Sequence, residues 1–313
     1  MSKHVLKREI RMKSFAFCKC FLSQNIFLPK LKLHVRYEND TQFRTEYRNF
    51  IPEKDIEPSL EAVKVEIKRR KQVRENVQER KDLVKTKYKQ LFPQVYNLAP
   101  DDVLMEHQSV QKISQDIFAL PVFKPEFAQN LLSEVKHFKS SQIPHEQPNS
   151  MNKHGVILDE IGFQDFFDQL RVDFIQPLAR QLFHMPDLEL DSHKAFMVKY
   201  RMDEDVDLAP HFDNAEVTLN VAMSANADFE GGELVFNSNN RVIQGYEHDF
   251  SHGVLHLGHQ IHQALPISSG ERWNLIVWAR SSRIRQSLCP MCGSAPQLDP
   301  APARSYGDGF LMN

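Results

Sequence analysis

A chain of 313 residues is long enough for one large domain or two moderate ones. Its apolar share of 41% and charged share of 26% are typical of a soluble globular protein, and a net charge of −2 gives no reason to expect a nucleic acid or an anionic membrane as partner. Four cysteines are too few for a disulfide-stabilised secreted scaffold and indicate a reducing compartment. We therefore expect an intracellular protein, cytoplasmic or nuclear, whose basic and apolar N-terminus is too short to span a membrane.

The first strong helical pattern is a charged stretch without glycine at residues 54–92. Leu60, Val63 and Ile67 share one helical face, and a second face follows after a phase shift, which predicts one long or broken amphipathic helix. Residues 61–90 contain eleven Lys/Arg and five Asp/Glu. Because acids are interleaved throughout, we interpret this stretch as a solvated helix face rather than a nucleic-acid-binding arm.

Two further helices are expected between residues 125 and 182. Pro125, at a favoured first-turn position, predicts the start of a helix whose core positions include Phe127 and Leu131. Residues 140–155 are polar and rich in turn-forming residues, so we expect a loop there. A single apolar stripe from Phe163 to Leu182 predicts a second helix, which Pro177 should kink.

The period of the apolar residues changes from about 3.6 to 2 after residue 195. Short alternating runs separated by turn residues predict several strands with no helices between them, as in a sandwich or barrel. The chain is thus expected to be α+β, and we divide it into a helical N-terminal region (1–118), helices packing on the core (119–194), a β core (195–283) and an irregular tail with a Cys-x-x-Cys pair (284–313).

The candidate chemistry lies in "APHFDNAEVTLNVAM", residues 209–223. Side chains two apart on an extended chain point the same way, so His211 and Asp213 project together. An imidazole and a carboxylate on one face are two ligands of a 2-His-1-carboxylate metal site. Alone, a His-x-Asp pair more often caps a turn or lies at a solvated strand edge.

Residues further along the chain strengthen the metal hypothesis. "VLHLGHQIHQALPISSGERWNLIVW" offers His256, His259 and His262 as candidates for a third ligand. Arg272 follows ten residues after His262 and, by alternation, shares a face with Asn274 and Ile276. A guanidinium in the interior needs an anionic partner, and its bidentate fork suits a carboxylate. The alternative is an arginine at the strand edge whose charge reaches solvent.

These motifs together resemble the 2-oxoglutarate- and iron(II)-dependent oxygenases, in the branch of prolyl 4-hydroxylases and procollagen lysyl hydroxylases. Residues 195–282 carry the resemblance, through the His-x-Asp pair, the Gly-Gly at a strand start, and a His ten residues before an Arg. The helices in front and the "SLCPMC" of the tail resemble one subfamily of these oxygenases, which extends the similarity to nearly the whole chain. The implied core is a double-stranded β-helix, or jelly roll.

The resemblance implies roles for individual residues. His211, Asp213 and His262 would bind iron; His262 is preferred because it begins a His-x-x-x-Pro motif ten residues before Arg272. Arg272 would bind the far carboxylate of 2-oxoglutarate. Three further positions are candidates for cosubstrate contacts: Tyr200, for which core packing is an equal alternative, Thr218 and Asn220.

The implied activity is that of a dioxygenase that consumes 2-oxoglutarate and O2, with L-ascorbate keeping the iron ferrous. The expected substrate is a side chain of a protein or peptide, of the lysyl or prolyl type, with no membrane or nucleic-acid partner. Two rivals stay open: a degenerate metal-binding interaction module without turnover, and a cupin-like isomerase or sensor that uses no 2-oxo acid.

The cysteines form two close pairs, Cys18 with Cys20 and Cys289 with Cys292. Four thiolates are a structural zinc donor set, so the pairs together predict a zinc site between the two ends of the chain. The first spacing is shorter than in most zinc sites, and free thiols are the alternative.

Overall fold

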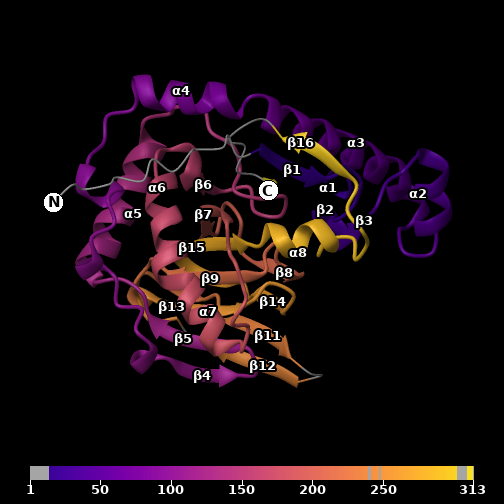
Figure 1. Ribbon diagram of the computed structural model, residues 1–313. Coiled ribbons are helices and arrows are strands. Elements are labelled where there is room, and N and C mark those ends of the chain that lie inside the picture. The colour runs from indigo at the N-terminus through magenta and orange to yellow at the C-terminus, as the bar shows by residue number, and fades with distance from the viewer. Residues whose placement is uncertain (1–13, 239–240, 247, 302–308, 313) are drawn as a thin grey trace, which may run out of the picture.

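The computed structural model describes residues 14–238, 241–246, 248–301 and 309–312 (Figure 1). Its centre is a pair of β-sheets. The larger sheet has the order β4 (Gln111–Ser114), β5 (Ile117–Pro121), β13 (His252–Leu257), β9 (Val217–Ala222), β15 (Ile267–Arg280), β7 (Ser192–Arg201) and β6 (Gly155–Ile157), with β10 (Phe229–Gly231) paired to β15. The smaller sheet has the order β12 (Arg241–Tyr246), β11 (Leu234–Ser238), β14 (Ile261–Ala264) and β8 (Leu208–His211).

Alternation along the central strands decides which layer each side chain enters. Met197, Leu219 and Leu275 belong to the main apolar core, which they share with residues of three helices, α5 (Pro125–Ser140), α6 (Gln164–Leu170) and α7 (Gln176–Leu182). The intervening side chains, among them Asn220 and Asn274, line a cavity together with residues of the smaller sheet. The two sheets therefore face each other across this cavity, and the predicted α+β fold with a jelly-roll core is confirmed.

The charged stretch forms two helices, α3 (Glu53–Glu75) and α4 (Val77–Lys87), which meet at Asn76 (Figure 1). A broken amphipathic helix is thus confirmed. Its basic face is less solvated than expected, because Arg70 and Arg74 are buried. The Arg70 guanidinium donates hydrogen bonds to the backbone carbonyls of residues 21, 24 and 25, so part of the positive charge holds the preceding chain in place.

The predicted helix at Pro125 and the loop at 140–155 agree with the structure, in which no helix or strand occurs between residues 141 and 154. The long stripe from Phe163 onwards forms α6 and α7, joined by a π-helical turn at Arg171–Ile175. Pro177 lies in the first turn of α7. Pro177 has no backbone N–H and cannot donate a hydrogen bond to the preceding turn. The regular α-helical hydrogen-bond pattern is therefore interrupted at this wider π-helical turn.

Several strands lie outside the range predicted for the β core. β4, β5 and β6 belong to the larger sheet although they precede residue 195. The tail is more regular than expected, since it contains α8 (Ser282–Ser287), β16 (Leu298–Ala301) and β17 (Phe310–Met312). Both of these strands pair with β1 (Ser14–Cys18) at the other end of the chain.

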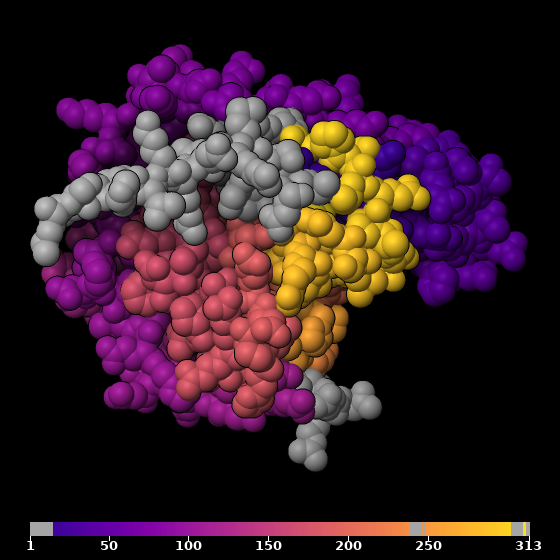
Figure 2. Space-filling view, viewed as in Figure 1, coloured from indigo at the N-terminus to yellow at the C-terminus, as the bar shows by residue number. Residues whose placement is uncertain are grey.

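The remaining N-terminal elements are α1 (Cys20–Ser23), the hairpin of β2 (Ile26–Leu28) and β3 (Leu33–Val35), and α2 (Asp40–Tyr47). Leu60 and Val63 of α3 pack with this hairpin in a small core of their own. In Figure 2 the yellow C-terminal residues lie directly against the indigo N-terminal region. Along the described part of the chain, no helix combines the length and apolar character needed to cross a bilayer.

Candidate metal centre

His211, Asp213 and His262 meet at one end of the smaller sheet. His211 ends β8 and lies directly opposite His262 of β14 in the antiparallel register. Their Nε2 atoms lie 3.6 Å and 3.7 Å from the two oxygens of the Asp213 carboxylate, and one donor atom from each residue falls within 4.8 Å of the others. The structure thus brings together two imidazoles and one carboxylate, a donor set that suits a metal ion.

The ring nitrogens that face away from the centre are fixed by the backbone. His211 Nδ1 lies 2.9 Å from the carbonyl of Ala209, and His262 Nδ1 lies 3.0 Å from that of Gln260. A proton on Nδ1 leaves Nε2 as the free acceptor, which is the tautomer a metal requires. On the third ligand, the Thr218 hydroxyl donates a 2.7 Å hydrogen bond to Asp213 Oδ2 and orients the carboxylate.

A close backbone approach holds the turn that carries Asp213. The backbone N–H of Asp213 donates to the carbonyl of Gly258, and the N–H of Gly258 donates to the backbone carbonyl of Glu216. A Cβ at position 258 would lie 1.9 Å from the carbonyl oxygen of Ala215, so only glycine fits here. Gly258, which lies between His256 and His259 in the sequence, therefore allows the turn with His211 and Asp213 to pack against the end of β13.

Burial and neighbouring groups set the protonation states of Asp213 and His262. Burial alone would raise the pKa of Asp213, but the His262 and His211 imidazoles hold it below its usual range. Burial, together with His211, lowers the pKa of His262 to about 3. The site thus presents an ionised carboxylate and a neutral His262 imidazole near pH 7, which is the protonation state that binds metal.

The two other candidate histidines differ in position. His259 is exposed and lies outside this cluster. His256 on β13 is fully buried, and its Nε2 lies 3.9 Å from Asp213 Oδ2 without a hydrogen-bond partner in the described chain. The structure therefore leaves His262 and His256 near the carboxylate, and only His262 joins His211 and Asp213 in a compact three-donor group.

Arg272 enters the same cavity from the larger sheet. This small cavity of about 30 Å³, called here the inner cavity, is lined by both sheets and includes the three clustered residues. Arg272 is 4% exposed, and its Nη1 has no hydrogen-bond partner among the described residues. Burial lowers the pKa of this guanidinium. A buried cation with an unbonded N–H group is costly, so the position is suited to an anion that is bound from solution.

The other predicted cosubstrate residues surround Arg272. Tyr200 lies opposite Arg272 across the β7–β15 pair, with the guanidinium carbon 5.5 Å from its ring centre. Asn220 accepts a 2.8 Å hydrogen bond from the Asn274 amide, whose own oxygen has no hydrogen-bond partner among the described residues. Thr218 also lines the inner cavity, although its hydroxyl is committed to Asp213.

His248 is a residue of this site that the sequence did not reveal. In "YEHDFSHG" it resembles a loop or strand-edge histidine, yet it is buried beside Asn274, with its Nδ1 3.4 Å from the amide nitrogen. Burial, and then the charge of Arg272, lower its pKa to about 3. Its Nε2 has no hydrogen-bond partner in the described chain. The segment before it has no apolar periodicity, so no sequence pattern could have placed it here.

The buried His248 should make the protein sensitive to acid. Because its pKa is depressed in the folded state, the unfolded chain binds this proton more readily between pH 6.5 and about 3. The free energy of unfolding should therefore decrease as the pH is lowered through that window, by about 1.4 kcal/mol per pH unit for this group. His248→Asn should flatten the slope by that amount in urea unfolding of metal-free protein. Parallel slopes for the two proteins would contradict the buried neutral state.

Comparisons with known proteins extend over nearly the whole chain. A family model described as "OGFOD2-like domain" matches residues 84–186. The chain is 38% identical to 2-oxoglutarate and iron-dependent oxygenase domain-containing protein 2 of Xenopus tropicalis, covering 93% of this chain and 91% of the relative. The human protein of the same name is 37% identical, with 95% and 94% covered.

This chain belongs to the family of 2-oxoglutarate and iron-dependent oxygenase domain-containing protein 2. The whole-chain resemblance seen in the helices and the tail is thereby confirmed. Among solved structures, a Pseudomonas putida prolyl-4-hydroxylase aligns over 53% of this chain and 93% of its own, with 15% identity and a TM-score of 0.41.

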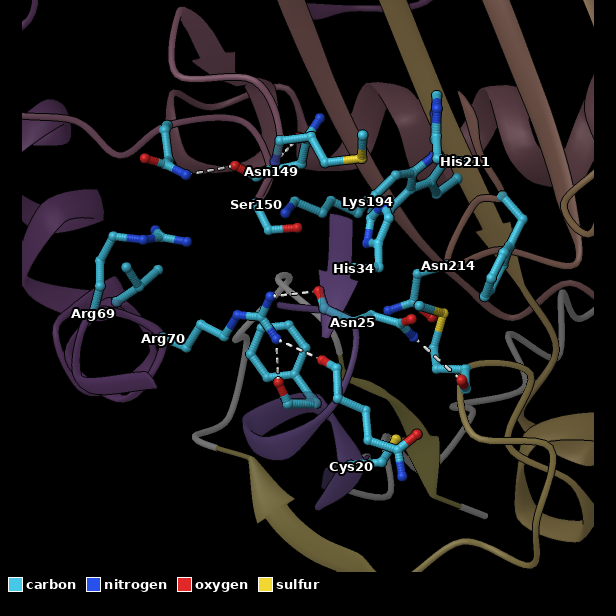
Figure 3. Close-up of a pocket in the computed structure, with 18 of the residues that line it drawn as sticks. Cys20, Asn25, His34, Arg69, Arg70, Asn149, Ser150, Lys194, His211 and Asn214 are labelled. Carbon is cyan, nitrogen blue, oxygen red and sulfur yellow. Dashed lines mark hydrogen bonds between the residues drawn. The ribbon is translucent and has the colours of Figure 1, made fainter. Parts of the chain in front are cut away.

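In this member of the oxygenase-domain family a second, larger cavity adjoins the metal centre. This outer cavity of about 330 Å³ is walled by α1, α3, the loop at 147–151 and one edge of the sheets (Figure 3). His211, Asn149, Leu208 and Trp278 line both cavities, so the metal centre lies where the two meet.

The N-terminal hairpin contributes a histidine to the outer cavity. His34 of β3 points into it near His211 in Figure 3, and neither of its ring nitrogens has a hydrogen-bond partner in the described chain. Burial, followed by the neighbouring His211, lowers its pKa to about 4. No sequence motif marks His34, because it reaches the cavity through a hairpin that only the folded structure brings there.

Proposed function

We propose that this protein is an Fe(II)- and 2-oxoglutarate-dependent dioxygenase that hydroxylates a side chain of a protein or peptide. His211, Asp213 and His262 would bind the iron, and Arg272 would bind the distal carboxylate of 2-oxoglutarate. The observation that carries the proposal is the buried, unbonded Nη1 of Arg272 in the same cavity as the three clustered ligands. Family membership supports both cofactors.

The residues present fit the iron. Two imidazoles whose Nδ1 atoms face backbone carbonyls and one oriented carboxylate leave coordination positions for a chelating cosubstrate and O2. When bound, the iron and its 2-oxo acid supply the oxidation of a C–H bond, with succinate and CO2 as co-products. The chain's own part is to hold Asp213 through Thr218 and to fix both imidazoles through backbone carbonyls.

The side chains of the inner cavity match the charges of the cosubstrate. A dicarboxylic 2-oxo acid has one end that chelates and one carboxylate that needs a cation, and Arg272 is the cation of this cavity. Polar groups without partners near the guanidinium, the Asn274 oxygen and His248 Nε2, are further candidates for contacts with the carboxylate or its bound water. Tyr200 and Asn220 complete the proposed cosubstrate pocket.

The outer cavity is where the substrate would reach the iron. Its volume is at the lower end for small-ligand sites, which suits one inserted side chain better than a large free metabolite. Its charged lining residues are four cations and one carboxylate: Arg69, Arg70, Arg74, Lys194 and Glu160. Arg69 and Arg70 pair with Glu66, but the cations around the cavity still outnumber the carboxylates, so an incoming ammonium would be disfavoured. We therefore propose an uncharged side chain, of the prolyl rather than the lysyl type.

Peptide hydroxylation tests this proposal. Protein with Fe(II), ascorbate, O2 and 2-oxoglutarate is incubated with peptide libraries that present proline or lysine in otherwise matched contexts. We expect a mass increase of one oxygen, with matching succinate, on proline-containing peptides. Turnover confined to lysine peptides would overturn the choice of side chain. Succinate formation without any oxidised peptide would overturn the proposed substrate class, and failure to bind 2-oxoglutarate would favour an interaction module.

A further inference from the structure

We propose that Cys18, Cys20, Cys289 and Cys292 bind one structural zinc ion, which fastens the two ends of the chain together. Their sulfur atoms all lie within 4.8 Å of one another although the pairs are far apart in sequence. Cys20 and Cys289 are 3.5 Å apart at sulfur, and all four thiols are free. The proposal is independent of oxygenase activity.

The sulfur distances distinguish a metal site from a disulfide. A tetrahedral zinc with bonds of about 2.3 Å places its sulfur atoms about 3.8 Å apart. The observed cluster spans this value, whereas a disulfide requires a separation of about 2.05 Å. Four thiolates also close the coordination sphere, as in structural zinc sites. Zinc is therefore the metal we propose here.

The C-terminal pair lies on a turn shaped to present both sulfurs. In Cys289-Pro290-Met291-Cys292-Gly293, the glycine has φ of +67°, and its N–H donates to the carbonyl of Cys289 at 2.8 Å. The backbone N–H groups of Cys292 and Met291 are directed at the sulfur of Cys289. N–H groups directed at a sulfur stabilise its thiolate, the form that binds metal.

Contacts with the tail and with α3 hold the N-terminal cysteine pair in place. Between Cys18 and Cys20, the N–H of Lys19 donates to Gln297 of the tail. The guanidinium of Arg74 lies 3.3 Å from the ring centre of Phe17, next to Cys18. Arg70 adds its hydrogen bonds to the backbone carbonyls of residues 21, 24 and 25. These contacts together hold the short Cys-x-Cys segment so that both of its sulfurs can bind one ion.

The zinc site would support the wall of the outer cavity. Cys20 and Met291 belong both to this cluster and to the lining of that cavity. Asn25, another lining residue, donates its amide to the carbonyl of Met291. Arg285 lines a small cavity together with Cys18, Cys20 and Cys289, and it donates a 2.6 Å hydrogen bond to Asn214, the neighbour of Asp213. Loss of zinc should therefore loosen both the cavity wall and the turn that carries Asp213.

Metal analysis of the full chain tests the proposal. Wild-type protein should contain one equivalent of zinc that survives mild chelation, and a mercurial reagent that blocks the four thiols should release it to a zinc indicator. Cys289→Ser and Cys292→Ser should lose the zinc. Ser294→Ala removes only a long 3.5 Å hydrogen bond from a hydroxyl to the carbonyl of Cys292, so this variant should keep the zinc. Asp213→Ala should also keep it, which separates this site from the iron centre.

Wild-type measurements keep the test decisive where a cysteine variant fails to fold. Cobalt substituted into the wild type should give the intense visible bands of tetrahedral thiolate coordination. Absence of bound zinc after incubation with the metal, with all four thiols reacting as free thiols, would overturn the proposal. A Cys20–Cys289 disulfide, or iron in place of zinc at the four sulfurs, would overturn it as well.

Discussion

Replacing Asp213 with alanine should abolish iron-dependent turnover and weaken Fe(II) binding by at least about a hundredfold. Loss of a residue that only supports a metal ligand already costs about ten- to a hundredfold in affinity, and Asp213 is the one anionic donor of the cluster. The effect should be read by anaerobic titration with Fe(II) and 2-oxoglutarate, in which wild type gives the visible charge-transfer band of the chelate and Asp213→Ala does not.

Two controls make the assignment specific. Asp203→Ala removes an exposed carboxylate that pairs with Arg201, and it should leave the band unchanged. His262→Ala should remove the band, whereas His256→Asn should keep it. If His256→Asn removes the band and His262→Ala keeps it, the third ligand is the histidine of β13 rather than that of β14. An unchanged band in Asp213→Ala would end the triad assignment.

Replacing Arg272 with methionine should raise the dissociation constant of 2-oxoglutarate by roughly ten- to a hundredfold while leaving Fe(II) binding nearly intact. A charge-assisted hydrogen bond contributes on the order of 1.5–3 kcal/mol, which corresponds to that range of affinity. Methionine fills a similar volume without placing an unpaired charge in the cavity. The measurement is titration of the iron-loaded protein with 2-oxoglutarate under anaerobic conditions.

Arg272→Lys separates charge from geometry. Lysine keeps the cation but loses the planar fork, so it should recover part of the affinity and not all of it. Arg201→Met, on the neighbouring strand and 42% exposed, is the matched control and should bind 2-oxoglutarate normally. Wild-type affinity in Arg272→Met would place the cosubstrate carboxylate on another residue.

Sequence patterns were sufficient to predict the parts of the structure that depend on residues close together in the chain. The segments after residue 195 were predicted to be extended, so the faces of their side chains could be assigned: Arg272, Asn274 and Ile276 do share the cavity face. His262 lies beside Asp213 whereas His259 is exposed, and the choice of His262 as the iron ligand stays a prediction. Alternation follows from the extended backbone itself and needs no tertiary information.

Contacts between distant segments could not be read in the same way. β5 was not expected in the sheet because its run "IFALP" is too short to distinguish from a linker, and it is fixed by pairing with β13 and with β4. The outer cavity depends on the N-terminal hairpin, and His34 reaches it only after that hairpin folds. Arg70 and Arg74 were interpreted as solvated charges because the partners that bury them include backbone carbonyls and aromatic rings about fifty residues earlier in the chain.

The most direct test of the central claim is the conversion of 2-oxoglutarate to succinate by purified wild-type protein supplied with Fe(II), ascorbate and O2. We predict slow succinate formation even without the primary substrate, dependent on added iron and absent in Asp213→Ala. Equal rates for wild type and Asp213→Ala, or no succinate from a wild-type protein that binds both iron and 2-oxoglutarate, would contradict the assignment of this protein as an oxygenase.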